Sequence, residues 1–468
     1  MPEKTRIIIS DLHIGKNDDL DIFKSATKTD LFSGLLSYWG SRKDPVELVV
    51  NGDFVDFLQL KPWNQFGRKT ALDKIQEITQ ASAQVFGIFG RFLQNPANSI
   101  TVLLGNHDVE LAYPEVRAEV EKAILAAAGG AAGGLNFLQD RTTYRFSING
   151  VLAQVEHGNA NDPWNALNYN SLFQDAETGT GTFRYPPGTH FVFDVINTFK
   201  GQFRFVDVLK PEMPAVPLIL LALRPLAASL AMPKAVLEAL AALGNGFLSG
   251  LRRRIAGPAL GPREAPALRP SELLAQQMAE QFAAALSATK PRLAFSDADE
   301  VEDFFATSAP LEETPAHATL GPKMDRVKRH LLAAALATLE RFKTDQNRSA
   351  FFAADHPENL AATWARTRLV GNVRIVVFGH THEALKTEFA EGVYLNSGAW
   401  ANLIGMPQGD PRVLSEWLAR IAANQFEVAC FPTYVKLAPA DGGVRASLNA
   451  WSSGNEELLW EKSISPSS

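Results

Sequence analysis

Arg6-Ile7-Ile8-Ile9-Ser10-Asp11-Leu12-His13 is the stretch that decides the fold, because an apolar, β-branched run ends there in an aspartate and a histidine. The apolar residues predict a short buried strand. Asp11 and His13 follow it directly, and the carboxyl ends of strands are where α/β sheets gather their ligands. The same arrangement, an apolar run followed by polar side chains, recurs along the chain.

Strand-like and helical patterns alternate in the first third of the sequence, which predicts a layered α/β domain. Asn149-Gly150 lies between two apolar runs and is a strong signal for a β-hairpin. We expect the tail after Glu456 to be frayed. The predicted strands are Arg6–Ser10, Glu47–Asn51, Ile100–Leu104, Thr143–Ile148, Val151–Glu156, Val373–Phe378, Val393–Asn396, Thr433–Leu437 and Ala446–Trp451, and the predicted helices are Lys28–Gly40, Lys69–Leu93 and Pro114–Ala128.

The composition changes after Asn161, where the chain becomes rich in Ala, Leu, Phe and Pro and shows helical periodicity. The strand pattern returns only near Val373. We therefore predict a catalytic core formed by residues 1–162 and 367–455, with residues 163–366 as a mainly helical insertion that caps it. Two segments of this insertion, Pro214–Met232 and Val236–Leu251, are apolar on more than one face.

Five polar clusters follow strand-like runs and carry the predicted chemistry. The glycines in them allow sharp turns close to a small ion. Asp, Asn and His without Cys suit Mn, Fe, Co, Ni or Zn. The clusters are Asp11-Leu12-His13, Gly52-Asp53, Gly105-Asn106-His107-Asp108, His157-Gly158-Asn159 and Gly379-His380-Thr381-His382.

These clusters supply enough ligands for two divalent metal ions. Asp11, His13 and His382 can bind one ion, and Asn106, His157 and His380 can bind the other. Asp53 can bridge the two. Ions held about 3.5–4 Å apart would clamp a phosphate and lower the pKa of a bridging water, which becomes the nucleophile.

His107 follows a predicted ligand and precedes Asp108, so we assign both to catalysis. His107 is expected to donate a hydrogen bond or a proton to a phosphoryl or leaving oxygen. Asp108 is expected to hold the tautomer of His107. Further candidates for contact with substrate are Asn159, Asp162, Arg184 and His190.

The quoted motifs resemble those of the calcineurin-like metallophosphoesterase family. The matching residues are Asp11-x-His13, Gly52-Asp53, Gly105-Asn106-His107-Asp108, His157 and Gly379-His380-x-His382, and Asn396-Ser397-Gly398 is similar to a turn that follows the last motif. The resemblance implies two packed mixed β-sheets flanked by helices, an αββα sandwich with two bound metals. The long spacing between His157 and Gly379 supports the insertion.

The net charge and the cysteine content bear on the class of partner and on the cellular location. The formal net charge is −6, which gives no electrostatic support for a nucleic-acid partner. Cys430 is the only cysteine, and Met1 leads almost directly into an apolar strand without a signal-peptide pattern. We therefore expect a cytoplasmic protein, and contact of the apolar insertion with a membrane surface remains an alternative.

The sequence thus predicts a binuclear metal-dependent hydrolase of phosphate esters. We favour phosphodiester or pyrophosphate cleavage on a small or lipid-like substrate, because a large cap restricts access to bulky phosphoproteins. A phosphomonoesterase acting on a small metabolite is the alternative within enzymes. A catalytically silent metal-binding protein and a membrane-surface binding protein are alternatives from other classes. The sequence leaves the oligomeric state open.

Overall fold

The chain divides into two compact units, one with Met1–Thr189, Ser349–Leu403 and Val428–Ser468, and one with His190–Arg348 and Ile404–Glu427. Both large sheets belong to the first unit. The structure is a computed structural model, and it describes residues 3–63, 67–129, 133–138, 143–162, 165–179, 183–200, 204–210, 360–401, 404–405, 417, 420, 425–426, 428, 430–452 and 454–466.

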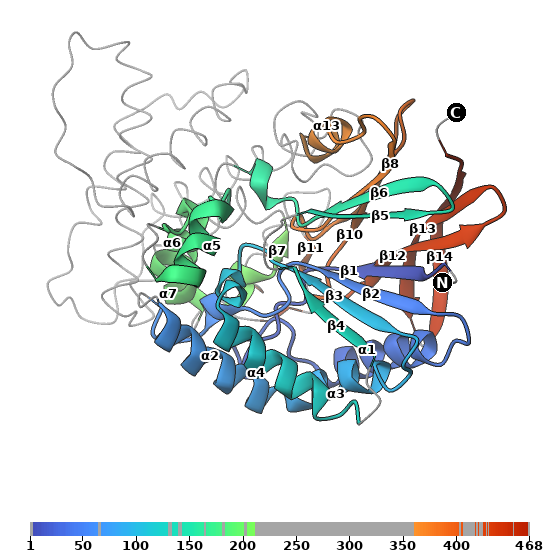
Figure 1. Cartoon of the computed structure of the whole chain (residues 1–468). Coiled ribbons are helices and arrows are strands. Elements are labelled where there is room, and N and C mark those ends of the chain that lie inside the picture. The colour runs from blue at the N-terminus through green and yellow to red at the C-terminus, as the bar shows by residue number, and fades with distance from the viewer. Residues whose placement is uncertain are drawn as a thin grey trace, which may run out of the picture. The chain divides into compact units, whose positions relative to one another are not determined.

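A seven-stranded mixed sheet forms one layer of the first unit (Figure 1). In spatial order its strands are β14 (Asn455–Ile464), β13 (Gly443–Ser452), β12 (Thr433–Ala440), β1 (Thr5–Ile9), β2 (Val46–Asn51), β3 (Ser99–Leu103) and β4 (Gly134–Phe137). The strands β1 to β4 are parallel, and β12 runs antiparallel to β1. The carboxyl ends of β1, β2 and β3 therefore meet at one edge.

A five-stranded mixed sheet forms the second layer, in the order β5 (Thr143–Ile148), β6 (Val151–Glu156), β8 (Val373–Phe378), β10 (Val393–Ser397) and β9 (Ala384–Glu388). β8 lies parallel to both β6 and β10. The predicted hairpin is confirmed, since β5 and β6 are joined at Asn149 and Gly150, which have φ angles of 46° and 82°. Positive φ at both central residues is what a type I′ turn requires.

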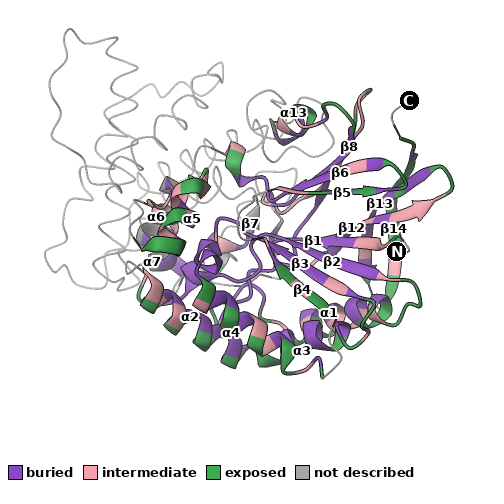
Figure 2. Cartoon of the chain, viewed as in Figure 1, coloured by how far each residue is buried: buried purple, intermediate pink, exposed green. Residues whose placement is uncertain are grey.

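The alternation of side chains along β1 explains how the layers pack. Ile7 and Ile9 join the core between the sheet and its helices, whereas Ile8 joins the core between the two sheets. The central strands are accordingly buried on both faces (Figure 2). The structure shows the predicted pair of mixed sheets flanked by helices. The helices on the seven-stranded sheet are α1 (Ala26–Gly40), α2 (Arg68–Ala81), α3 (Ala83–Phe92) and α4 (Pro114–Leu125), and α13 (Leu360–Arg366) packs on the five-stranded sheet.

Two predicted elements differ from the structure. The helix expected over Lys69–Leu93 is divided into α2 and α3 at Ser82, whose hydroxyl donates a hydrogen bond to Gly15 O at 2.8 Å. The tail after Glu456 is not frayed, because it forms most of β14 and pairs with β13. β14 is a largely exposed edge strand, and its polar pattern explains why the sequence did not show it.

The second unit contributes few described elements. The chain enters it through α6 (Pro187–Phe191), and β7 (Leu209–Lys210) pairs in parallel with β11 (Ile404–Gly405) inside it. The apolar segments Pro214–Met232 and Val236–Leu251 of the predicted insertion lie outside the described residues. In the part of the chain that the structure describes, no helix combines the length and the hydropathy that crossing a membrane requires.

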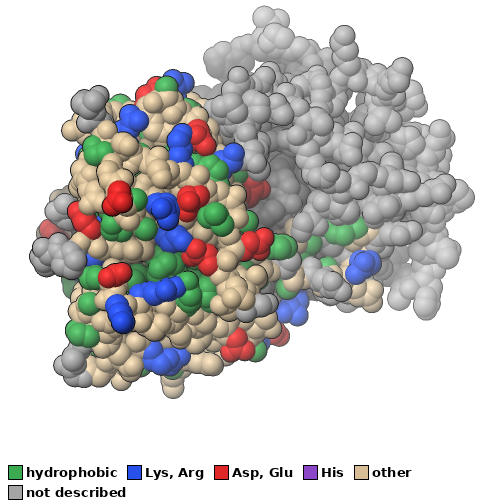
Figure 3. All heavy atoms as spheres, turned by 90° about the vertical axis from the view of Figure 1, so that its right-hand side faces the viewer, with side chains coloured by type: hydrophobic (Ala, Val, Ile, Leu, Met, Phe, Trp, Pro, Cys, Tyr) green, Lys and Arg blue, Asp and Glu red, His purple; other side chains and the backbone are tan. Residues whose placement is uncertain are grey.

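The surface on the side of the C-terminal strands mixes basic, acidic and hydrophobic side chains (Figure 3). Two ion pairs join strands that are not adjacent in a sheet. Lys436 of β12 pairs with Glu456 of β14, and Lys462 of β14 pairs with Glu388 of β9. Charges of opposite sign therefore offset one another locally between these strands.

Candidate metal centre

The seven predicted metal ligands all lie in loops that directly follow strands. Because β1, β2 and β3 are parallel, and β6 is parallel to β8, these loops open at common sheet edges. The structure brings all seven residues together at one site. Asp11 and His13 follow β1, Asp53 follows β2, Asn106 follows β3, His157 follows β6, and His380 and His382 follow β8.

Five of these residues have a left-handed backbone conformation that side chains other than glycine rarely adopt. Among the other described non-glycine residues, only Asn17 and Asn149 share it. Such a conformation costs about 1–3 kcal/mol per residue and is typical of functional sites that the surrounding structure enforces. The φ angles are 55° for Asp11, 50° for His13, 48° for Asp53, 67° for His380 and 60° for His382.

Two glycines in the motifs allow the loops to approach closely. A Cβ atom at Gly105 would lie 2.1 Å from Asp53 Oδ1, and a Cβ atom at Gly379 would lie 2.4 Å from Ser10 Oγ. Any larger residue at either position would push a ligand loop away. The glycines of these two motifs are thus needed for packing within the site.

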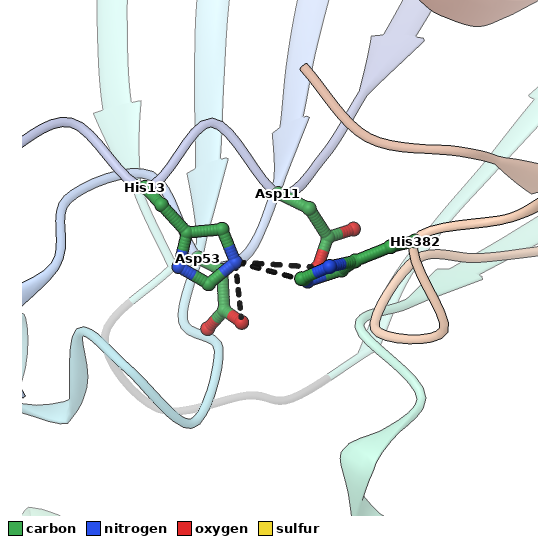
Figure 4. A group of neighbouring side chains, drawn as sticks. All are labelled: Asp11, His13, Asp53 and His382. Atoms are coloured by element: carbon green, nitrogen blue, oxygen red, sulfur yellow. Dashed lines mark hydrogen bonds and ion pairs between the residues drawn. The ribbon is translucent and has the colours of Figure 1, made fainter. Parts of the chain in front are cut away.

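The first group of candidate ligands is Asp11, His13, Asp53 and His382, whose ligand atoms lie within 4.8 Å of one another (Figure 4). The Nε2 atoms of His13 and His382 are 3.0 Å apart. Asp53 Oδ2 lies 3.6 Å from His13 Nε2, and Asp11 Oδ1 lies 3.3 Å from His382 Nε2. Two imidazole nitrogens and two carboxylate oxygens thus face a common point, a donor set that suits borderline divalent ions.

The second group is Asp53, His157 and His380. Asn106 completes it, since His157 Nε2 lies 3.2 Å from Asn106 Oδ1 and 3.3 Å from Asp53 Oδ2. Asp53 belongs to both groups, which is the position that a bridging ligand needs. The structure therefore places the residues in the two sets that we predicted, with Asp53 between them.

Hydrogen bonds on the far side of two imidazole rings fix which nitrogen faces the site. His157 Nδ1 donates to Asn51 O at 2.8 Å, because a carbonyl oxygen can only accept. His13 Nδ1 lies 3.1 Å from Asp56 Oδ2, and a carboxylate there also accepts the proton. When these two rings are neutral, Nε2 therefore carries the lone pair that can bind a cation, as in most histidine ligands of metals.

Asp11 provides a test of whether this site fits a cation. Its Oδ2 accepts hydrogen bonds from Ser10 Oγ and from the backbone N–H of His380. Its Oδ1 is buried, and when His382 is neutral this oxygen accepts no hydrogen bond from the described residues. A buried carboxylate oxygen without a donor costs about 1–3 kcal/mol or more. A metal ion at the first group removes this cost, so the residues present fit the ion.

The charges of the site stabilise the ionised carboxylates that metal binding requires, and they also favour the protonated form of His157, whose proton a bound metal ion would displace. Burial raises the pKa of Asp11, but the charge and hydrogen bond of His382 together with the charge of His157 lower this pKa to about 2. The pKa of Asp53 is likewise held well below its usual range, chiefly by His157 against the effect of burial. Burial lowers the pKa of His157, while the charge of Asp53 raises it to about 9. The carboxylates are therefore ionised at neutral pH.

His107 lies beside both groups but has a different partner from the one we predicted. Its backbone N–H donates to Asp53 Oδ1 at 2.9 Å, and its ring lies 4.6 Å from that of His13 between centroids. Its Nδ1 lies 3.2 Å from Asp56 Oδ2. The predicted pairing of His107 with Asp108 is wrong, and Asp56, three residues after Asp53, occupies that position.

Asp108 instead connects two loops of the site. Its Oδ1 accepts from Gly105 N at 2.6 Å, and its Oδ2 accepts from Phe54 N at 2.7 Å. The side chain is fully buried, and burial together with the charge of Asp53 raises its pKa to about 7. Asp108 therefore holds the loops that carry Asp53 and Asn106 at a fixed separation.

The turn that follows β10 joins the two sheets behind the ligands. Ser10 Oγ lies 2.7 Å from Ser397 Oγ and 2.9 Å from Gly398 O. Asn396 Nδ2 donates to Gly379 O at 2.7 Å. Sequence reasoning did not assign Ser10, although its place directly before Asp11 was the available signal.

The four candidates for substrate contact lie in different places in the structure. Asn159 is buried and bonded within its own loop, and Asp162 contacts His380. Arg184 is exposed, and His190 lies on α6 where the second unit begins. Comparison of the chain with models of known families and with curated proteins gave no match.

Proposed function

We propose that this protein hydrolyses phosphate esters with the help of two divalent metal ions, and that it prefers phosphodiesters or pyrophosphates to monoesters. The observation that carries the proposal is the pair of ligand groups that share Asp53, with His107 beside them. The side chain of His107 is 20% exposed, whereas those of His13 and Asp53 are 1% exposed. A substrate can therefore reach His107 from solvent.

Asp11, His13, His382 and Asp53 would hold one ion, and Asp53, Asn106, His157 and His380 would hold the other. Ions bound there supply Lewis acidity that polarises a phosphoryl oxygen and activates water. Mn, Fe, Zn, Ni and Co all match the donor set.

His107 is the residue that we assign to proton transfer. Water adds to phosphorus and releases a proton to solvent, the bond from phosphorus to the leaving oxygen breaks, and that oxygen takes a proton from His107, which regains one from solvent. Asp56 accepts a hydrogen bond from His107 Nδ1, so the other ring nitrogen faces the reacting groups. The same carboxylate stabilises the protonated ring.

Hydrolysis of two chromogenic substrates tests this function. The purified protein is stripped of metal, loaded in turn with Mn, Ni, Zn or Fe, and assayed with bis-p-nitrophenyl phosphate and with p-nitrophenyl phosphate. We expect metal-dependent turnover with a higher kcat/KM for the diester. A higher value for the monoester would indicate a phosphomonoesterase instead. No turnover of either substrate, with two metals bound, would contradict the proposal and favour a binding protein.

A further inference from the structure

Hydrogen bonds connect the described residues that follow His157. Asp162 N donates to Asn159 O at 3.0 Å, and Asn165 N donates to Asp162 O at 3.0 Å. Asn159 Nδ2 donates to Asn165 O at 2.9 Å, and Tyr169 Oη donates to Asn159 Oδ1 at 3.0 Å. These hydrogen bonds hold Asn159, Asp162 and Asn165 in position relative to one another.

Two of these side chains contact candidate ligands of the second metal group. Asp162 Oδ2 lies 3.1 Å from His380 Nε2 and accepts a hydrogen bond from Asn165 Nδ2 at 2.7 Å. Asn106 Nδ2 lies 3.5 Å from Asn165 Oδ1, at the limit for a hydrogen bond. A continuous chain of polar contacts therefore runs from His380 through Asp162 and Asn165 to Asn106.

We propose that Asp162 and Asn165 are positioning residues for the second metal ion, an inference that rests on the proposed two-metal function. A carboxylate that accepts the Nε2 proton of His380 leaves Nδ1 as the coordinating nitrogen of that ring. An amide group of Asn106 that donates to Asn165 turns its Oδ1 toward His157 and the ion. Both ligands are thus oriented by residues that follow His157.

The first metal group has its own orienting carboxylate, because His13 Nδ1 contacts Asp56. Asp162 and Asn165 contact His380 and Asn106, which both belong to the second group. Loss of Asp162 should therefore weaken the second ion and leave the first in place. Removal of such an orienting partner reduces metal affinity by about 10- to 100-fold.

Metal titration of the full-length protein tests this selectivity. Metal-free wild type, Asp162→Ala and Asp162→Asn are titrated with Mn(II) against a chromophoric chelator, and the bound ions are followed by electron paramagnetic resonance. In the wild type, we expect the first equivalent of Mn(II) to give the spectrum of an isolated ion. The second equivalent should convert it to the spectrum of two interacting ions. Asp162→Ala should bind the first ion normally and the second about 10- to 100-fold more weakly. Asp162→Asn, which keeps an oxygen acceptor, should be affected less.

Asp175→Asn is the matched control, because Asp175 accepts from Tyr113 Oη at 3.0 Å on the nearby helix α5 (Tyr169–Thr178) and touches none of the ligands. It should bind both ions as the wild type does. Unchanged affinity for both ions in Asp162→Ala would overturn the inference and leave the proposed function standing. Equal loss of both ions would also overturn it. A wild type that binds fewer than two ions would overturn the proposed function itself, and this inference with it.

Discussion

Asp56 Oδ2 contacts two histidines at once, lying 3.2 Å from His107 Nδ1 and 3.1 Å from His13 Nδ1. Gln59 Nε2 also donates to this oxygen at 2.7 Å, and Leu58 N donates to Asp56 Oδ1 at 2.9 Å. Burial would raise the pKa of Asp56, but the charges and hydrogen bonds of His107 and His13 hold it far below its ordinary value. One carboxylate therefore orients a candidate metal ligand and the candidate proton donor.

Replacing Asp56 with Asn should affect metal binding and turnover together. The amide cannot stabilise a protonated His107, and it holds His13 less firmly. We expect affinity for the first metal to fall about 10- to 100-fold, and kcat at saturating metal to fall as well. Asp19→Asn, at an 80% exposed acid in a nearby loop, is the control. Wild-type kcat in Asp56→Asn under saturating metal would remove Asp56 from the chemistry.

Replacing His107 with Ala should separate turnover from metal binding. Its ring belongs to neither of the two proposed ligand groups, although it forms a third cluster with His13 and Asp56, so both ions should remain bound. Loss of one acid or oxyanion-stabilising group should lower kcat by about 10²- to 10⁴-fold. Elemental analysis gives the metal content, and steady-state kinetics gives kcat. Normal turnover in this variant would show that another group transfers the proton.

Replacing Asp53 with Asn should weaken both metal ions, because Asp53 is the one residue that belongs to both ligand groups. Asp11→Asn is the matched comparison, since Asp11 belongs to the first group alone. We expect the Asp53 variant to lose most bound metal on dialysis and the Asp11 variant to keep its second ion better. Near-full metal content in Asp53→Asn by elemental analysis would contradict the bridging assignment.

The sequence was sufficient to predict that the candidate ligands lie together, because their positions depend mainly on strand order. Asp11, Asp53 and Asn106 follow buried apolar runs, and parallel pairing of those runs places their ends side by side. The same reasoning placed His157 and His380 after a second set of apolar runs. Apolar periodicity therefore located the site before any contact was known.

The hydrogen-bond partners of the site residues could not be predicted from strand order, because they depend on the directions of side chains within loops. Asp108 follows His107 in sequence, yet its oxygens turn to Gly105 and Phe54. Asp56 is distant from His107 in sequence and reaches it through the loop after β2. The break at Ser82 has the same origin, since it depends on a tertiary hydrogen bond to Gly15.

Lys28 on α1 provides a prediction that is independent of the metal centre. Its side chain is buried, its Nζ donates to Ile22 O at 2.6 Å, and burial lowers its pKa from 10.5 to about 8, against the opposing charges of Cys430 and Asp21. Between pH 8 and pH 10.5 the unfolded chain keeps a proton that the folded protein has released. The free energy of unfolding should therefore rise with pH across this window, and the full cost of the buried charge applies below pH 8.

Replacing Lys28 with Met removes this cost and also leaves Ile22 O without its donor. Removing the buried charge should stabilise the folded protein by about 3 kcal/mol, and losing the hydrogen bond should destabilise it by about 1–2 kcal/mol. The free energy of unfolding should therefore increase by about 1–2 kcal/mol at pH 7. Urea unfolding of both proteins at pH 7, 9 and 10 measures it, with Lys24→Met at a partly exposed site as the control. The advantage of the Lys28 variant should shrink as pH rises toward 10, because the wild-type amine is then neutral when folded. An advantage that stays constant over this range would show that Lys28 does not titrate near pH 8.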